Sequence, residues 1–203
     1  MKLPKPHPVL QIWRKMPPLK IKEGVPVMKC MRGDPFSDVC IIAPAPQPED
    51  YEQGTPLSNP SALFFHGLLK EETGLSTQRC CVLPCSRYGF KANKASTIDI
   101  CEALQKMVKL NQFKLYITVG DDAYKFFFGR GKKPAPSIFG NIMYVAEVGH
   151  KPVFSFPELT GLHISSLPGD RRAANKAIDW QNKVETQFRE LMRVLKPLAQ
   201  KFV

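Results

Sequence analysis

The stretch VCIIAPAPQPEDYEQGTP, residues 39–56, decides the fold of this chain. It opens with an apolar run, Val39 to Ala43, that ends at Pro44, which is the pattern of a buried strand. Acidic residues follow within the same stretch, as in a functional loop at the end of a strand. The turn itself, residues 43–47, carries no acid, base or nucleophile. The stretch therefore has the outline of an active-site loop whose tip lacks a reactive side chain.

Predicted strands and helices alternate along the rest of the chain. Further strands are predicted at Arg79–Leu83, Leu115–Val119, Ile142–Val148 and Val153–Phe156, the last two joined as a hairpin through Gly149 and His150. Helices are predicted at Ser61–Glu72 (capped by Asn59 or Ser61), Thr97–Asn111, Asp121–Phe128 and most of Arg171–Phe202.

This alternation predicts a parallel sheet with helices on both faces. We expect an α/β three-layer sandwich with a central, mostly parallel sheet of four to five strands. One domain, residues 34–203, would follow a basic, proline-rich arm, residues 1–33, that packs on it. Ligands bind such sheets where loops leave the carboxyl ends of strands, so the loop after Ala43 lies where a site is expected.

The composition favours a globular protein with a polyanionic partner. The chain has 203 residues, 43% of them hydrophobic, and its 29 Lys and Arg outnumber 18 Asp and Glu, giving a net charge of +11. A charge of this size favours a nucleic acid as the partner. No apolar run approaches the roughly 18 residues of a membrane span, and the N-terminus lacks the apolar core of a secretory signal. We expect a monomer that binds DNA and no membrane.

The chain has six cysteines, and no pair has the C-x-x-C spacing of a zinc or redox site. Cys40, Cys80 and Cys81 lie in or beside apolar runs, where cysteine acts as a small hydrophobic residue. The simplest interpretation is a reducing compartment, so we expect a cytoplasmic or nucleoid-associated protein.

Several short motifs occur in a fixed order. They are GDP (residues 33–35), APAPQ (43–47), ED (49–50), GTPL (54–57), ITVGDDAYKFFFG (117–129) and LHISSL (162–167). In order and spacing the pattern resembles the uracil-DNA glycosylase superfamily, most closely its iron–sulfur, thermostable branch, over nearly the whole chain after residue 10. In that branch the turn reads Gly-Glu-Ala-Pro-Gly, and the later loop reads His-Pro-Ser/Ala-x-Leu.

The resemblance also shows where the family's usual chemistry is missing. Pro44 stands at the position of the branch's catalytic Glu, and Ala45 at the Asp or Asn of other branches. Cys81 stands at the base-reading Asn, at the end of the second strand, and Leu57 at the base-stacking Phe. Uracil discrimination depends on such paired polar contacts, so ordinary uracil is not expected to be the best substrate.

The cofactor of this branch is also affected. Met16 and Leu19 occupy the first two positions of the cluster cysteines, whereas Cys85 and Cys101 keep the last two with the family's spacing. A cluster of this kind needs four thiolates. We therefore expect no cofactor and no metal.

The resemblance and the positions of the acids indicate a candidate site. Asp50, and after it Glu49, are the candidate catalytic carboxylates for the sugar, although both could instead cap a turn or face water. His163 would stabilise the departing base, the alternative being an ordinary loop histidine. His66 is expected to be structural. The predicted base-pocket residues are Ala45, Pro46, Gln47, Tyr51, Leu57 and Cys81.

A DNA-contacting surface is implied beside this pocket. Leu167 would be a wedge that fills the gap left by an extruded base, the alternative being a leucine that covers the core. The remaining residues predicted to contact the DNA backbone are Ser165, Ser166, Arg171, Arg172 and, in the basic loop GRGKK, Arg130, Lys132 and Lys133.

Two functions remain open at this point. The first is a DNA glycosylase that extrudes a nucleotide and cleaves the N-glycosidic bond of a non-standard base, for example a bulky modified one, leaving an abasic site. The second is a catalytically inert DNA-binding member of the superfamily, acting in replication, repair or phage–host conflict. Glu49, Asp50 and the loop from His163 to Leu167 favour the first, whereas Pro44 and Ala45 favour the second.

We predict that the purified protein is colourless and holds no stoichiometric iron, because Met16 and Leu19 cannot supply thiolates. Visible absorption and elemental analysis of iron and acid-labile sulfide would test this. A brown protein with bound iron and sulfide would show that other residues complete a cluster.

Overall fold

The computed structural model describes residues 31–85, 113–128, 138–164 and 167–203. Its strands are β1 (Arg32–Gly33), β2 (Val39–Ala43), β3 (Cys81–Pro84), β4 (Leu115–Val119), β5 (Ile142–Val145) and β6 (Lys151–Phe156). Its helices are α2 (Pro48–Gln53), α3 (Pro60–Thr73), α5 (Asp121–Phe128), the short 3-10 helix η2 (Ala146–Val148) and α6 (Arg171–Ala199). None of the helices within these ranges is both long and apolar enough to cross a membrane.

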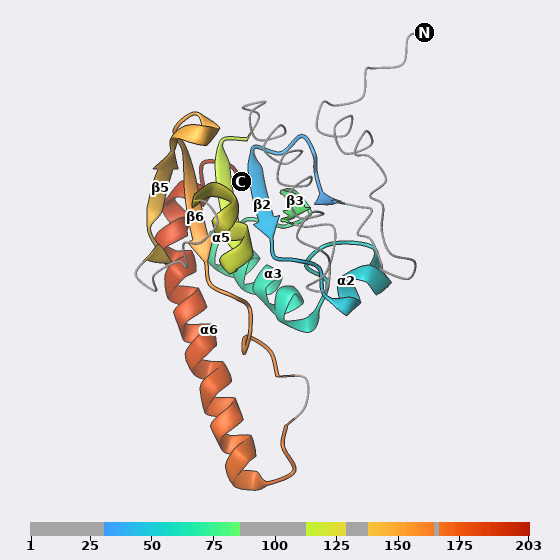
Figure 1. The fold of residues 1–203 in the computed structure, drawn as a ribbon. Helices are drawn as coiled ribbons and strands as arrows, with labels where there is room; N and C mark the ends of the chain where they lie inside the picture. Colours follow the sequence, from blue (N-terminus) through green and yellow to red (C-terminus); the bar gives the residue numbers. More distant parts are fainter. Residues whose placement is uncertain (1–30, 86–112, 129–137, 165–166) are drawn as a thin grey trace.

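The strands form one six-stranded sheet in the order β1-β3-β2-β4-β6-β5 (Figure 1). The four central strands, β3, β2, β4 and β6, run parallel, and the two outer strands are antiparallel to their neighbours. The α/β architecture with a mostly parallel sheet flanked by helices is thus confirmed, with six strands in place of the expected four to five.

The sixth strand is β1, which the sequence analysis assigned to the N-terminal arm. Its two residues pair with β3, so the folded domain begins before residue 34. Gly33 has a φ of 81°, and a Cβ there would lie 2.0 Å from the carbonyl oxygen of Cys80. Only glycine permits this approach of the two backbones. A two-residue strand has too little hydrophobic pattern to be predicted from sequence.

Most other elements lie where the sequence predicts them. The buried apolar runs form β2 and β4, and α3 is capped by Asn59, whose side chain accepts a hydrogen bond of 2.9 Å from the Ala62 N–H. The predicted strand Ile142–Val148 ends early, because the chain turns into η2 before Gly149 and His150 reverse it with positive φ. The predicted helix Thr97–Asn111 lies outside the described residues.

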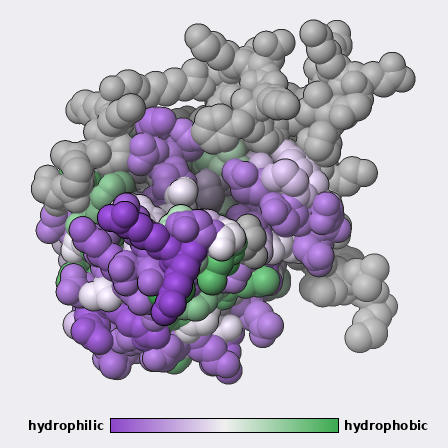
Figure 2. All heavy atoms as spheres, turned by 90° about the horizontal axis from the view of Figure 1, so that it is seen from below, coloured by the Kyte–Doolittle hydropathy of each residue, from purple (hydrophilic) through white to green (hydrophobic). Residues whose placement is uncertain are grey.

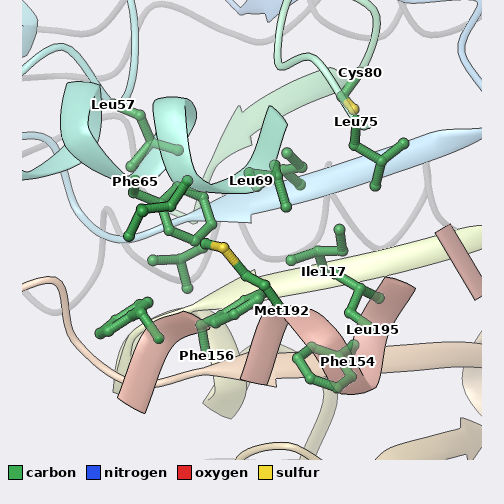
Figure 3. Packing of buried hydrophobic residues seen from close by; sticks show 14 of the residues in the cluster. Leu57, Phe65, Leu69, Leu75, Cys80, Ile117, Phe154, Phe156, Met192 and Leu195 are labelled. Atoms are coloured by element: carbon green, nitrogen blue, oxygen red, sulfur yellow. The ribbon is translucent and has the colours of Figure 1, made fainter. Parts of the chain in front are cut away.

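One face of the sheet packs against α3 and α6 to form the core (Figure 3). Phe156 of β6 is fully buried, and its ring lies 5.2 Å from that of Phe65 of α3 and 5.8 Å from that of Phe188 of α6. Phe154 extends this apolar contact along β6, and Ile117 extends it onto the neighbouring strand β4. Dense packing of this kind makes each buried methylene count toward stability.

The core predicts different costs for one substitution at two positions of α3. Leu69 is fully buried, and Leu69→Ala should lower the free energy of unfolding by about 2–5 kcal/mol, because it removes apolar contacts and leaves a cavity. Leu63 is 52% exposed on the same helix, and Leu63→Ala should change it by less than about 0.5 kcal/mol. Urea denaturation of both variants measures the difference, and equal losses would mean that α3 packs on the sheet through another face.

Candidate functional site

The carboxyl ends of the four parallel strands meet at one edge of the sheet, where ligands bind in folds of this kind. The turn at residues 43–47 leaves β2 at this edge, between the ends of β3 and β4. Two backbone hydrogen bonds join neighbouring strand ends: Cys85 N–H donates to Ala43 O at 2.8 Å, and Gly120 N–H donates to Phe156 O at 3.0 Å. The edge is therefore a fixed frame for the loops that leave it.

The turn itself is packed against the domain. Ala45 is 6% exposed and Pro46 is buried, whereas Gln47 is half-buried. The Gln47 side-chain amide donates to Ala45 O at 3.3 Å. Tyr51, also half-buried, follows one turn later on α2. Of the predicted pocket residues, Gln47 and Tyr51 thus retain polar groups within reach of solvent.

Asp50 holds the turn in place. Its side chain is 3% exposed, one carboxylate oxygen accepts the N–H of Gln47 at 2.9 Å, and the other accepts the N–H of Ser58. Burial raises the pKa of Asp50, and these two N–H groups act against the rise. This is the capping role considered as the alternative from the sequence. Glu49, the other candidate carboxylate, is exposed.

Arg32 is a residue that sequence reasoning missed. Its guanidinium donates to the carbonyl oxygen of Leu57 at 2.7 Å. Burial lowers the pKa of Arg32, and the nearby Asp50 carboxylate opposes this. Arg32 and Asp50 therefore fix residues 57 and 58 from two sides. The available signal in the sequence was the position of Arg32 directly before the GDP motif.

Leu57 is one of the predicted base-pocket residues. It is 1% exposed and lies in the core beside Phe65 (Figure 3). Its φ of 58° is in the left-handed region, which is uncommon for a residue other than glycine. This backbone turn directs the side chain inward, onto α3, and the base-pocket role of Leu57 stays a prediction.

Cys81, another predicted base-pocket residue, is not at the carboxyl end of its strand. It is the first residue of β3, is fully buried, and pairs in register with Cys40 and Gly33. The register places Pro84 beside Ala43, so Cys85, also buried, is the cysteine nearest the turn. The predicted strand, Arg79–Leu83, begins two residues before β3 and ends one residue before its last residue, Pro84.

His163 lies on the loop that follows β6. Leu159 and Leu162, both in the core, anchor this loop, and the Leu162 N–H donates to Leu159 O at 3.1 Å. His163 is half-buried, and its Nδ1 is buried without a hydrogen-bond partner among the described residues. A buried ring nitrogen without a partner is unusual in a folded protein, and among the described residues the Nε2 of His66 is in the same state.

Leu167, four residues on, is 53% exposed and does not cover the core. Arg171 and Arg172 are exposed at the start of α6, where Asp170 caps the helix by accepting the Ala173 N–H at 2.8 Å. The other predicted DNA contacts, Ser165, Ser166, Arg130, Lys132 and Lys133, lie outside the described residues.

A second group of acids stands at this edge, after β4 and β6. The Asp121 N–H donates to the Glu158 carboxylate at 2.9 Å, and Asp122 pairs with Lys125 at 2.8 Å. Much of the Glu158 side chain is open to solvent, but its carboxyl group loses hydration against the helix end, which raises its pKa. Within the described ranges, no group of three or more His, Cys, Asp or Glu side chains is arranged to hold a metal ion. The signal in the sequence was the pair of acids directly after Gly120.

His66 fits the structural role expected for it. It lies on α3 beside Phe65, with the ring centres 6.3 Å apart. Burial, together with the smaller effect of the nearby Arg32 guanidinium, lowers the pKa of His66 to about 4, so the imidazole is neutral at pH 7. A neutral, half-buried imidazole of this kind packs as part of the α3 surface.

The parallel sheet, with its loops and histidine at the carboxyl edge, defines an α/β protein with a ligand site of the type found in open, mostly parallel sheets. Residues 30–193 match the family model of the uracil DNA glycosylase superfamily. Because this match covers most of the chain, the protein belongs to that superfamily. Comparison with curated proteins gave no significant match. Members of the superfamily are generally DNA glycosylases, so the family implies DNA binding and glycosylase-like chemistry.

The two acids of α2 predict opposite results for the same kind of substitution. Asp50→Asn should lower the free energy of unfolding by about 1–3 kcal/mol, because an amide NH₂ cannot accept one of the two buried N–H groups. Glu49→Gln should change it by less than about 0.5 kcal/mol, because Glu49 is exposed. Thermal or urea unfolding of both variants at neutral pH gives the comparison. If Asp50→Asn is as stable as the parent, the carboxylate is not the anchor of the turn.

Proposed function

We propose that this protein is a DNA glycosylase that removes a non-standard base, with bulky modified bases as the first class to test. The observation that supports catalysis most directly is the unpaired, buried Nδ1 of His163 on the loop after β6, in a chain of this superfamily. A buried ring nitrogen that has no hydrogen-bond partner among the described residues is available to a group that arrives with the substrate.

In the proposed reaction the bond between C1′ and the base nitrogen breaks, and its electron pair leaves with the base. Water adds its oxygen to C1′ and releases a proton, which leaves an abasic site. His163 would hydrogen-bond to the departing base and stabilise its negative charge. A carboxylate would stabilise the positive charge on the sugar.

The carboxylate has to come from outside the turn, since Pro44 and Ala45 carry none. Asp50 is the first candidate from the sequence, but both of its carboxylate oxygens accept backbone N–H groups, which supports a role in positioning the turn. Glu49, exposed on α2, and Asp121, half-buried at the end of β4, are better placed to approach a sugar that enters from solvent. We propose Glu49 and Asp121 as the residues to test for this role.

The proposed specificity follows from side chains that no longer recognise uracil. Leu57 is in the core and Cys81 is buried in the sheet, so neither supplies a stacking ring or a two-way amide. Gln47 and Tyr51 are the polar side chains near the turn that could read a different base edge. The four described cysteines are free thiols, which supports a cytoplasmic or nucleoid-associated location as part of this proposal.

A second candidate is a catalytically inert DNA-binding protein. The engagement of Asp50 as a helix cap, together with a turn built from Ala and Pro, favours it. On this interpretation the fold would hold DNA at the same edge, and no N-glycosidic bond would be cut.

We expect the protein to leave alkali-labile abasic sites in duplex DNA that contains a hypermodified pyrimidine, and to act poorly on uracil. His163→Asn should lower the single-turnover rate about 100- to 1,000-fold, the scale of removing one preorganised donor. His150→Asn is the matched control, because His150 is exposed at the β5–β6 hairpin and asparagine tolerates its positive φ.

A panel of duplexes that carry uracil, thymine-derived bases and hypermodified cytosines supplies the measurement. Glu49→Gln and Asp121→Asn on the same panel identify the carboxylate. DNA binding without excision on every duplex would establish the inert alternative, and equal rates for the two histidine variants would remove His163 from the chemistry.

A further inference from the structure

The first half of α6, residues 171–183, contributes no buried residue to the core. The helix has 29 residues, about 43 Å at the usual rise of about 1.5 Å per residue. Its buried residues begin at Val184, so residues 171–183, about 20 Å of helix, contain none. Figure 1 shows this half extending past α3 at the end of the molecule where β2 ends. The projecting half therefore stands on the same side as the candidate site.

The cations of the two halves of α6 differ in whether they have carboxylate partners. In the core half, Arg189 binds Glu71 and Glu72 of α3 as well as Glu185, at 2.7 to 2.9 Å, and Arg193 lies 3.6 Å from Glu72. The projecting half carries four exposed cations, Arg171, Arg172, Lys176 and Lys183. Among the described residues, none of these four forms an ion pair. The cations of the core half thus serve the fold, whereas those of the projecting half are free for a partner.

Three of these cations share one face of the helix. Arg172, Lys176 and Lys183 are spaced i, i+4 and i+11, and at about 100° per residue they form a narrow stripe. Asp179 lies at the border of this stripe and is the only acid of residues 171–183. From Arg172 to Lys183 the stripe runs about 16 Å along the helix axis. One DNA strand presents roughly five phosphates over such a length.

The projecting half is fixed to the loop that carries His163. Gly161, with a φ of 83°, lies under the indole of Trp180, and a Cβ at that glycine would be 2.4 Å from the Trp180 Nε1. Leu162, the next residue, is fully buried in the core. This contact therefore holds the first half of α6, with its basic stripe, against the loop at a point two residues before His163.

The geometry points to an extension of the DNA-contact surface along α6: we propose that Lys176 and Lys183, together with Arg172, bind the phosphate backbone of duplex DNA beside the nucleotide held at the sheet edge. This rests on the DNA binding included in the proposed function. A second copy of the chain is a poorer fit, because the exposed apolar residues Ile178 and Trp180 lie on opposite sides of the helix and form no continuous apolar face. Figure 2, which views this end of the molecule, shows a largely hydrophilic surface.

The test is the salt dependence of duplex binding by the full-length protein. The variant R172Q/K176Q/K183Q removes three charges from the stripe. The control, K70Q/K196Q/K201Q, removes three charges from exposed lysines elsewhere. If each stripe cation displaces one counterion, the slope of log K against log salt should fall by about 2.7 for the stripe variant and by less than about 1 for the control.

Equal slopes for the stripe variant and the parent would overturn the proposal, as would equal losses in the stripe and control variants. A changed sedimentation coefficient in the stripe variant would assign the face to self-association instead. A salt slope that falls in the stripe variant of a protein that excises no base would retain this surface and reject the glycosylase. A parent protein that binds no duplex would reject both.

Discussion

The complete burial of β2 is the constraint on which the rest of the structure depends. A central strand of a parallel sheet is covered on both faces, so all five residues of β2 have to be apolar. The helices that connect the parallel strands supply this cover. The contact between Phe156, Phe65 and Phe188 ties β6, α3 and α6 together on one of those faces. Once this packing is in place, the carboxyl ends of four strands come to a single edge, and the position of the functional loops is set.

At that edge the turn at residues 43–47 is held in a defined conformation, and its tip carries no acid, base or nucleophile. The carboxylate of Asp50, close to the turn, accepts the backbone N–H groups of Gln47 and Ser58 and holds them in place. Arg32 reinforces the same segment through Leu57. A charged group used in this way stabilises a loop conformation and is less free to meet a substrate. Under the proposed function, the reactive groups come from the adjacent loops, where Asp121 and His163 lie.

The distribution of positive charge follows the same division between fold and function. Arg189 lies in a network of carboxylates that staples α6 to α3, and exposed networks of this kind contribute modestly to stability. The projecting half of α6 has cations without such partners among the described residues, on a helix that the core does not need. Residues 171–183 contribute no fully buried residue, so an external partner is the simpler explanation for these cations.

The sequence by itself determined the elements whose signals are local. The apolar runs of β2 and β4, the Asn59 cap of α3 and the long amphipathic pattern of α6 could all be read directly, because periodicity and capping act within a few residues. Motif order also led to the correct superfamily. Only the tertiary structure decided which side chains meet. The contact between Arg32 and Leu57 joins residues 25 positions apart, and the inward turn of Leu57 and the register of Cys81 depend on how β1, β3 and α3 pack. Such choices arise from strand register and backbone dihedral angles, which leave no periodic trace in the sequence.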